Sequence, residues 1–492
     1  MTYQNPVIAG FHPDPSVCRV GDEYILVHSS FTYVPGVPVF RSRNLVDWLQ
    51  IGNVLVRPSQ LDLTATVDWS SLGIYAPTIR HHDGRFWVVT TNVGTNGARN
   101  FLVTAEDPAG PWSDPVPLPL AGIDPDIAWD DEGNCWVHFS GPGGIARCRM
   151  DTTTGQVLAG PDLTWSGTGL QYPESPHLFE RDGTWYLMIA EGGTHQGHAV
   201  SIARAPSPVG PWDGTPSNPI LSHRSTDQPI QNTGHADMVE ATDGSWWMVL
   251  LGVRPHGIGP GFHVLGRETF LTPVDWVDGW PVPHDVQLEM GGRPPRAAAP
   301  MATFEREDFD GFELGPTWVG VRRHPSAVSS LRTRPGWLVL KGGEATLDSP
   351  KPVYVGRRQQ HRCCRVRALV DVGGANEAGL ALMMDETAHY DVAVHRGQII
   401  VRARVGPLHT VVGSSSCPPG PVILTIATEP DGHGPDTVAL GFEDATGAFQ
   451  ALARLDGRYL SSEVTGGFLG RTIGMYVVGG DAAFDWFDYE EA

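Results

Sequence analysis

The sequence predicts an all-β chain, a five-bladed β-propeller followed by a β-sandwich. A five-fold repeat of short strands and tight turns fills about the first 280 residues, unrepeated short strands follow it, and no long amphipathic helix is visible. Short strands at regular spacing with turn residues between them are typical of propellers and sandwiches. The 492 residues exceed one ordinary domain core, so a division into domains is expected.

Each repeat has the same order of parts. A short strand opens it, a tight turn with a glycine follows, and an aromatic-rich strand and a third strand complete it, as in DPSVCRVGDEYILVHSS and ESPHLFERDGTWYLMIAEGG. The turn glycines are Gly21, Gly84, Gly133, Gly183 and Gly244. Asp-Gly pairs, which favour hairpins, begin at Asp83, Asp182 and Asp243. Antiparallel units at this period indicate the blades of a propeller.

The residues that open the five repeats are expected to meet at one place. They are Asp14, Ala76, Asp124, Glu174 and His235, spaced 62, 48, 50 and 61 residues apart, and four of the five are ionisable. Because the innermost strand of each blade lines the central channel, these positions converge on the axis. Ionisable groups are costly to bury there, so their convergence indicates a functional site.

The repeat stops near Trp280, which suggests a domain boundary. We assign residues 1–285 to the propeller that carries the predicted site, 286–303 to a linker or wrapping segment, and 304–492 to a β-sandwich that packs on the propeller. The boundary stretch PVPHDVQLEMGGRPPRAAAP is rich in Pro, Gly and Ala, as linkers often are. The predicted sandwich strands are GWLVLKG, CRVRALVDV, GLALMMD, YDVAVHR, QIIVRARV, VILTIAT, TVALGFE and TIGMYVVG.

Composition narrows the class of ligand. The net charge of −21 disfavours nucleic acids and anionic membranes as partners, although solubility alone is an alternative reason for it. The 16 Trp, 11 Tyr and 17 Phe suit strands, and they also suit a sugar site, where a flat ring covers the C–H face of the sugar. The six cysteines lack CxxC spacing. The start MTYQNPVIAGFHPDPS shows no signal peptide and no apolar run reaches 18 residues, so a cytoplasmic location is expected.

The carboxylates Asp14, Asp124 and Glu174 fit the cleavage of a glycosidic bond. That reaction needs an acid that protonates the leaving oxygen and a base or nucleophile opposite it. The prolines on both sides of Asp14 hold it extended, as suits a fixed base, and apolar neighbours can raise the pKa of Glu174. Asp124 can raise that pKa further by repulsion. A turn Asp and a surface-loop Glu are the alternatives. Carboxylates ~6.5–9.5 Å apart give inversion and ~5–5.5 Å apart give retention, and the sequence leaves both open.

Two further residues are candidates for the site. His235 is either a structural hydrogen-bonding residue or a ligand of a metal ion or water. Arg254, in LLGVRP, follows a strongly apolar strand, and a buried arginine needs a partner such as an active-site carboxylate or a sugar hydroxyl. Neither GxSxG nor a phosphate-binding glycine loop occurs in a fitting context, which disfavours serine-hydrolase and nucleotide chemistry.

The stretch NPVIAGFHPDPSVCRVGDEYILVHSSFTYVPGVPVFRSRNLVDW resembles glycoside hydrolase family 43, in the branch of β-xylosidases and α-L-arabinofuranosidases. The resemblance continues through RPSQLDL, GIYAPTIRHHDGRFWV, GIDPDIAWDDEG, YPESPHLFERDGTWYLMIAEGGT and GHADMVEATDGSWWMVLLGVRP, over roughly residues 1–285. It implies a five-bladed propeller, a concanavalin-like jelly-roll sandwich after it, and an inverting mechanism. It also implies that Asp14 is the general base, Glu174 the general acid, and Asp124 the residue that positions the acid and tunes its pKa.

The resemblance further implies a set of substrate-binding residues. They are Arg254, Phe31, Tyr75, His195 with Gln196, His235, and Phe468 in the sandwich loop TGGFLG, which closes over the propeller's pocket. His235 matches a channel histidine that in some relatives contacts a calcium ion or water, and no cofactor is otherwise required. The chain departs from the family at Asp126, where relatives usually carry Ser or Ala, and at Tyr75, where many xylosidases carry Trp.

The resulting hypothesis is an exo-acting, inverting glycoside hydrolase. It releases terminal α-L-arabinofuranosyl residues, β-D-xylosyl residues or both from hemicellulose-derived oligosaccharides. A catalytically silent sugar-binding propeller and a family member specific for another glycan are the alternatives. A sialidase or fructosidase type lacks support, because neither SxDxGxxW nor a WMNDPNG-like start occurs. The expected partner is the oligosaccharide, without nucleic acid or membrane, and self-association into a homo-oligomer is left open.

Overall fold

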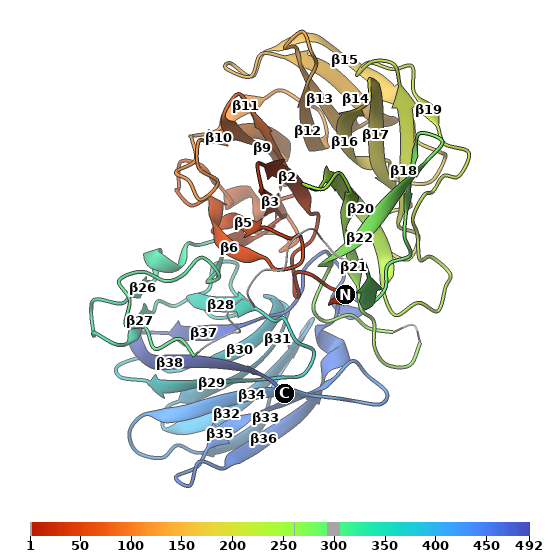
Figure 1. Ribbon diagram of the computed structural model, residues 1–492. Coiled ribbons are helices and arrows are strands. Elements are labelled where there is room, and N and C mark those ends of the chain that lie inside the picture. Colours follow the sequence, from red (N-terminus) through yellow and green to blue (C-terminus); the bar gives the residue numbers. More distant parts are fainter. Residues whose placement is uncertain (1, 260, 293–305) are drawn as a thin grey trace.

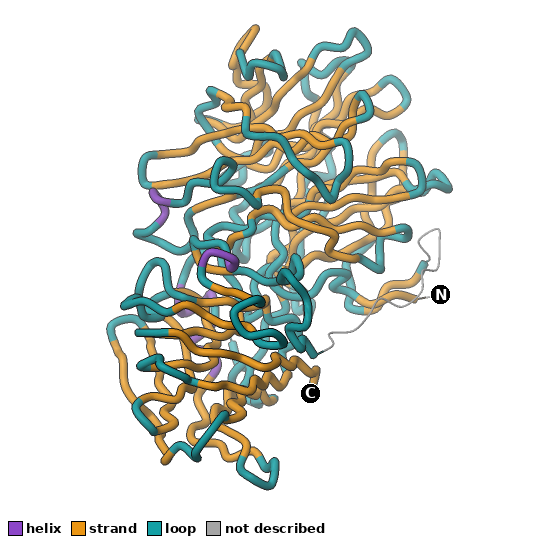
Figure 2. The backbone as a smooth tube through the Cα atoms, turned by 90° about the vertical axis from the view of Figure 1, so that its left-hand side faces the viewer, coloured by secondary structure: helices purple, strands orange, loops and turns teal. Residues whose placement is uncertain are grey.

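The computed structural model describes residues 2–259, 261–292 and 306–492, and it is built almost entirely from antiparallel strands. Figure 1 shows two parts: the sheets of the first half of the chain, coloured red to green, and those of the second half, teal to blue. Figure 2 shows how strands dominate both parts. The predicted all-β class is confirmed. Most of the predicted linker, residues 293–303, lies outside the described residues.

Five antiparallel sheets follow one another in the described residues of the N-terminal part. The first contains β2 (Ser16–Val20), β3 (Glu23–Val27), β5 (Gly36–Ser42) and β6 (Leu49–Leu55). The second contains β7 (Gly73–Ile74), β8 (Thr78–His82), β9 (Arg85–Gly94), β10 (Gly97–Ala105) and β11 (Val116–Leu118). The third contains β12 (Ile123–Trp129), β13 (Cys135–Gly141), β14 (Gly144–Met150) and β15 (Val157–Trp165). The fourth contains β16 (Glu174–Arg181), β17 (Thr184–Glu191), β18 (Ala199–Ala205) and β19 (Asp213–Gly214), and the fifth β20 (Gln231–Glu240), β21 (Trp246–Val253), β22 (Glu268–Val277) and β23 (Trp280–Pro283).

The five sheets are arranged around a common centre. Strand β2 contacts β8, β8 contacts β12, β12 contacts β16, β16 contacts β20, and β20 contacts β2 again. The N-terminal segment packs against the end of the first half of the chain. Strand β1 (Thr2–Gln4) pairs with β24 (Glu289–Gly291). The Asn5 side chain forms hydrogen bonds with the backbone N–H and C=O of Leu271 in the fifth sheet. The first strands of the five repeats therefore lie next to one another, as the repeat predicts.

Two of the three Asp-Gly pairs form the hairpins that the sequence predicts. The pairs at Asp83 and Asp182 are two-residue loops between β8 and β9 and between β16 and β17, and both residues of each loop have positive φ. That geometry matches the twist of the flanking strands, and Asp-Gly adopts it readily. The loop at Asp243 is longer, because Glu240 pairs with Trp246, and Asp243 does not have positive φ.

The C-terminal part is a sandwich of two sheets. The seven-stranded sheet runs in the order β26 (Ser329–Ser330), β27 (Leu338–Lys341), β38 (Asp481–Glu491), β29 (Cys364–Asp371), β34 (Val422–Glu429), β35 (Thr437–Glu443) and β36 (Phe449–Asp456). The six-stranded sheet runs β28 (Tyr354–Arg358), β37 (Thr472–Val478), β30 (Glu377–Asp385), β31 (Ala388–His395), β32 (Gln398–Val405) and β33 (Leu408–Ser416). Alternate residues of both sheets, such as Val366, Leu380, Val392 and Leu424, form one apolar core between them.

Helices are few and short. The described residues contain the 3₁₀ turns η1 (Thr64–Thr66), η2 (Pro325–Ala327) and η3 (Gly457–Leu460), and the four-residue α-helix α1 (Ser462–Thr465). None of the helices in residues 2–259, 261–292 and 306–492 is long and apolar enough to cross a membrane.

The two parts are joined by backbone pairing and by an apolar cluster. Strand β25 (Gly320–Val321) of the sandwich part pairs with β4 (Tyr33–Val34) of the first sheet's loop. Behind it, Phe11 and Phe31 pack in one cluster with Leu347, Tyr354 and Tyr476. The buried guanidinium of Arg322 donates to the carbonyl of Thr66 and to that of Pro350. The sandwich therefore holds the residues around Phe31 in place.

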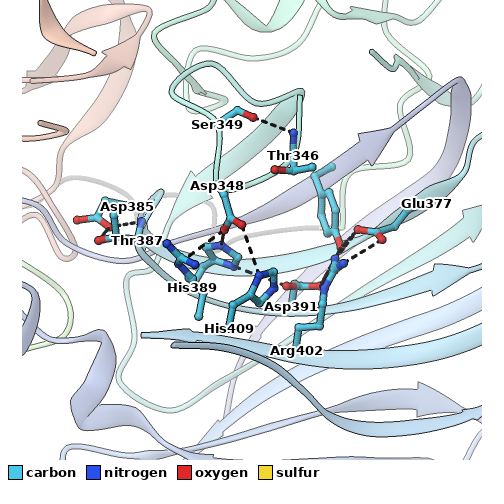
Figure 3. A network of polar contacts seen from close by, with 12 residues as sticks. Thr346, Asp348, Ser349, Glu377, Asp385, Thr387, His389, Asp391, Arg402 and His409 are labelled. Carbon is cyan, nitrogen blue, oxygen red and sulfur yellow. Dashed lines mark hydrogen bonds and ion pairs between the residues drawn. The ribbon is translucent and has the colours of Figure 1, made fainter. Parts of the chain in front are cut away.

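A polar network secures the sandwich loop that reaches this cluster. Asp348 contacts His389 and His409, and Arg402 bridges Asp391 and Glu377 on the neighbouring strands (Figure 3). Leu347, next to Asp348 in this loop, belongs to the apolar cluster around Phe31. The network thus supports one wall of the interface between the two parts.

Candidate functional site

The residues that open the inner strands share an unusual backbone conformation. Asp14, Asp124, Ser175 and His235 have φ between 45° and 56°, and the last three lie in β-bulges of their strands. Left-handed backbone at residues other than glycine costs ~1–3 kcal/mol each and gathers at functional sites. The bulges aim side chains of different sheets at one place.

The register changes one detail of the predicted repeat. Ile123 and Glu174 hold corresponding places before the bulge, so the counterpart of Asp124 is Ser175, not Glu174. Glu174 lies one residue earlier, and its longer side chain still reaches the other two carboxyl groups. The sequence contains a sign that Ser175, not Glu174, aligns with Asp124: a proline directly follows each of Asp14, Ala76, Asp124 and Ser175.

Asp14 is held as a carboxylate by donors on two sides. The Nη1 of Arg267 donates to its Oδ1 at 2.8 Å, the hydroxyl of Ser29 donates to its Oδ2, and Nδ1 of His235 lies 3.5 Å from Oδ1. Burial by itself raises the pKa of Asp14, but the Arg267 charge, His235 and the Ser29 hydroxyl outweigh it, so the pKa lies below its usual value. Asp14 is therefore ionised at neutral pH.

Glu174 and Asp124 have the opposite electrostatic character. Desolvation and the negative charge of Asp14 raise the pKa of Glu174 to about 7, although Arg267 partly offsets the increase. Burial and the charges of Glu174 and Asp14 also raise the pKa of Asp124 well above its usual value, against the N–H of Ser175 and Arg267. The two groups titrate together, so the pair keeps a proton near neutral pH. An ionised carboxylate thus lies near a pair of carboxyl groups that keeps a proton.

The arginine in contact with Asp14 is Arg267, which sequence reasoning missed. It immediately precedes β22, its Nη1 also donates to Thr194 at 3.1 Å, and its guanidinium carbon lies 5.6 Å from the ring centre of Phe31. The predicted Arg254 instead forms a two-pronged ion pair with the buried Glu268, at 2.7 and 2.8 Å. A direct contact of Arg254 with substrate stays a prediction.

Aromatic side chains form one wall of the site. Phe31 lies 5.1 Å from Tyr75 and 5.8 Å from Phe468 between ring centres, and Trp69 lies 5.6 Å from Phe468. Phe31 and Tyr75 come from the first and second repeats and Phe468 from the sandwich. The three predicted aromatic residues are therefore brought together, with Arg267 against both phenylalanines.

A cavity of about 230 Å³ opens between this wall and the sandwich. Its lining includes the predicted His195, Gln196 and Phe468, and also Thr194, Asn232, His263, Arg267, Ser462, Glu463, Gly466 and Gly467. Arg267 lines the cavity and also contacts Asp14, but the carboxylates Asp14, Asp124 and Glu174 do not themselves line it.

Residues 461–471 of the sandwich close this cavity. Glu463 accepts a hydrogen bond from the backbone N–H of His263 at 2.9 Å and contacts its ring nitrogen, and the N–H of Phe468 donates to Ser71 at 2.9 Å. A Cβ on Gly467 would lie 2.3 Å from the Ser71 hydroxyl, so only glycine allows this approach. The sandwich is part of the site rather than a separate module.

His235 fits a calcium ion poorly. Burial lowers the pKa of its imidazole to about 3, which keeps it neutral, as a metal ligand must be. Calcium, however, prefers six to eight oxygen ligands. The next carboxylates along the axis, Asp126 and Asp237, are both bound by Arg80, and the described residues contain no group of three or more His, Cys, Asp or Glu side chains suited to a metal. Calcium at His235 stays a prediction.

Other site residues were also missed from the sequence. Ser29 and His198 lack a motif of their own: Ser29 lies in a short polar run after β3, and His198 immediately precedes β18. His198 is buried, its Nδ1 bonds the carbonyl of Asn232 at 2.9 Å, and its Nε2 has no partner among the described residues. A Cβ on Gly234 would lie 2.4 Å from its ring, so this glycine permits the packing of His198. Only the fold brings these residues to Asp14.

An ionised carboxylate, a carboxyl pair that keeps a proton and an aromatic wall beside Arg267 are typical of a carbohydrate-cleaving hydrolase of the acid–base type. Comparison with protein families agrees: residues 3–281 match glycosyl hydrolases family 43, and residues 306–490 match the β-xylosidase C-terminal concanavalin A-like domain. The chain belongs to glycosyl hydrolases family 43.

Individual relatives cover nearly the whole chain. A non-reducing end α-L-arabinofuranosidase of Bacteroides ovatus is 40% identical over 99% of this chain and 94% of its own length. A xylosidase/arabinosidase of Butyrivibrio fibrisolvens is 39% identical over 82% of each chain. The solved structure of a xylan β-1,4-xylosidase from Bacillus halodurans is 31% identical, with a TM-score of 0.91 over 99% of this chain and 100% of the other.

Proposed function

We propose that this chain is an exo-acting, inverting glycosidase. It releases terminal α-L-arabinofuranosyl residues, β-D-xylosyl residues or both from hemicellulose-derived oligosaccharides. The observation that carries the proposal is the opposite electrostatic character of Asp14 and Glu174, which both feel the charge of Arg267. The names of the relatives, an arabinofuranosidase and a xylosidase/arabinosidase, support the substrate class.

The proposed reaction is a single displacement. The carboxylate of Asp14 takes a proton from a water as the water oxygen attacks the anomeric carbon. The bond from that carbon to the leaving oxygen breaks on the opposite face, and the leaving oxygen takes the proton of Glu174. Asp124, whose carboxylate accepts a hydrogen bond from the N–H of Ser175, positions Glu174, while burial and the charge of Asp14 raise the pKa of Glu174 to about 7. One attack from the opposite face inverts the anomeric centre.

The proposed architecture is a five-bladed propeller for residues 1–285 and a jelly-roll sandwich for residues 304–492, joined by the segment 286–303. The closed ring of inner strands supports the propeller, and the order of the two facing sheets supports the sandwich. No cofactor takes part in the proposed reaction. Nucleic acid and membrane are not expected as partners, and the cytoplasmic location and self-association stay predictions.

Proton NMR of the released sugar tests the reaction. The enzyme is mixed with the aryl α-L-arabinofuranoside and, separately, with the matched aryl β-D-xyloside, and the anomeric signals are followed before mutarotation. We expect turnover of at least one substrate and first release of the anomer opposite to that of the substrate. First release of the same anomer contradicts inversion. Calorimetric binding of the sugars without turnover of either substrate would favour the silent sugar-binding alternative.

The closing role of the sandwich predicts a binding defect in Phe468→Ala. Truncation removes a ring that packs on Arg267, Phe31 and Trp69, so substrate loses one wall of its site. We expect kcat/KM to fall ~10- to 100-fold, mainly through KM, since ~1.5–3 kcal/mol of aromatic burial is lost. Steady-state kinetics measure it. Tyr459→Ala, an exposed aromatic of the nearby η3, is the matched control and should behave as wild type. Equal KM for wild type and Phe468→Ala would remove the sandwich from substrate binding.

A further inference from the structure

One guanidinium touches the inner strands of all five sheets. Arg80 lies on β8 of the second sheet, and its Nη1 donates to Asp237 on β20 at 2.8 Å and contacts Ser16 on β2 at 3.3 Å. Its Nη2 donates to Asp126 on β12 at 2.8 Å and contacts Nδ1 of His177 on β16 at 3.0 Å. We call these five residues the axial cluster.

The axial cluster is buried and its carboxylates are saturated with donors. The side chains of Asp126 and Asp237 are 0% and 3% exposed. Oδ2 of Asp237 also accepts from the hydroxyl of Ser16 and the N–H of Val17, and Oδ2 of Asp126 accepts from the N–H of Leu178. Burial raises the pKa of Asp237, but Arg80 and His177 outweigh it and lower the pKa overall. Two buried negative charges therefore depend on one cation.

Four residues of the axial cluster lie close in sequence to residues of the proposed active site. Ser16, Asp126, His177 and Asp237 lie two residues after Asp14, Asp124, Ser175 and His235, respectively. The first residue of each pair has the strained left-handed backbone. A shift of the cluster residue therefore moves the site residue that lies two positions before it. Glu174 adjoins Ser175 and moves with it. An error of ~1 Å in such a site can cost ~100-fold in rate.

We propose that Arg80 is a positioning residue, a permanent cation on the propeller axis that holds Asp14, Asp124 and Glu174 in their working arrangement. The inference rests on the proposed function of those three carboxylates. The buried acid at position 126 is accommodated because Arg80 forms an ion pair with it as well as with Asp237. The guanidinium thus supplies at the axis the positive charge that a bound cation would otherwise supply.

A second cavity makes this proposal directly testable. It measures about 410 Å³ and is lined by Arg80, Cys18, Ile127, Phe179, Met238 and neighbouring residues. These residues follow the axial cluster along their strands, so the cavity lies on the side of Arg80 away from the carboxylates of the site. A small solute can reach the space left by a truncated Arg80 without entering the substrate cavity.

The experiment is chemical rescue of Arg80→Ala. We expect kcat to fall ~100-fold with KM within a few-fold of wild type. Guanidinium chloride at tens of millimolar should restore kcat at least tenfold. Urea, its neutral isostere, and sodium chloride of equal ionic strength should not. Arg147→Ala, which removes a half-buried arginine of the third sheet, is the matched control and should neither lose kcat nor respond to guanidinium.

Two readouts separate failure of this proposal from failure of the proposed function. The thermal unfolding midpoint of Arg80→Ala should rise with guanidinium relative to urea, whatever substrate the enzyme cleaves. The rate profile of the variant should also shift to higher pH, because Asp126 and Asp237 without a cation raise the pKa of nearby carboxyl groups. Wild-type kcat in folded Arg80→Ala, or restored stability without restored kcat, overturns the positioning role. If Arg80→Ala does not fold, Arg80→Gln keeps a hydrogen-bond donor but not the cation, and unchanged kcat in it overturns the proposal equally.

Discussion

Asp14→Asn is expected to lower kcat by ~10²–10⁴-fold on every substrate of the enzyme. The amide has the shape of the carboxylate: its oxygen can still accept from Arg267, and its NH2 group can donate to the Ser29 hydroxyl in place of the oxygen that accepts from it, so the local structure is preserved. It cannot take a proton from water, however, and Glu174, whose pKa is raised to about 7, is needed as the acid. Steady-state kinetics on oligosaccharides and on aryl glycosides should show the same loss, because the base is needed for both.

The control for Asp14→Asn is Asp83→Asn at an exposed hairpin turn. Asn tolerates the positive φ of Asp83, so this variant changes one acid to an amide without touching the site. It should retain wild-type kcat and thermal stability. If Asp14→Asn kept more than about a tenth of wild-type kcat, the assignment of Asp14 as general base would be wrong.

Glu174→Gln is expected to show a loss that depends on the leaving group. On natural oligosaccharides, whose leaving alcohols need a proton, kcat should fall by ~10²–10⁴-fold. On aryl glycosides with good leaving groups the loss should be less than about tenfold, because such groups leave without protonation. The contrast separates an acid from a base, since Asp14→Asn should not show it.

The pH profile of wild type checks the same assignment. Glu174 must be protonated to act, and its pKa is raised to about 7, so kcat/KM should fall as pH rises through about 7. Asp14 must be ionised, and its lowered pKa keeps it so well into the acid range. In Glu174→Gln the fall at high pH should disappear. Glu180→Gln, at the exposed far end of the same strand β16, is the control, and an equal loss on both substrate types in Glu174→Gln would reject the acid role.

Strand prediction succeeded for eight of the thirteen strands of the two sandwich sheets. All eight predicted sandwich runs correspond to strands, and each contributes to the core between the two sheets. The eight runs omit β26, β28, β33, β36 and β38. Of these, β28 and β38 are largely buried, whereas β33 and β36 contain no buried residue. Strands β33 and β36 are held by pairing with β32 and β35, which a local pattern does not reveal.

The site was predicted where a repeat or a motif marked the residue. Asp14, Asp124 and His235 stand at corresponding positions of an internal repeat, and their convergence follows from the architecture alone. Arg267 stands at no repeat position and in no motif. It precedes the third strand of its repeat, and Arg254 has a similarly apolar sequence context. The choice between them depends on which carboxylate each can reach, Asp14 or Glu268, and that is a property of packing.

The sequence by itself determined the all-β class, the order of repeats and sandwich strands, and the candidate carboxylates, because strand period, turn chemistry and repetition are local properties of the chain. Only the tertiary structure decided which groups are ionised, which arginine serves Asp14, and how Arg80 joins the five inner strands. It also decided that residues 461–471 of the sandwich complete the cavity. Electrostatics and close packing depend on groups far apart in the chain, and burial strengthens their interactions only once the fold has excluded water.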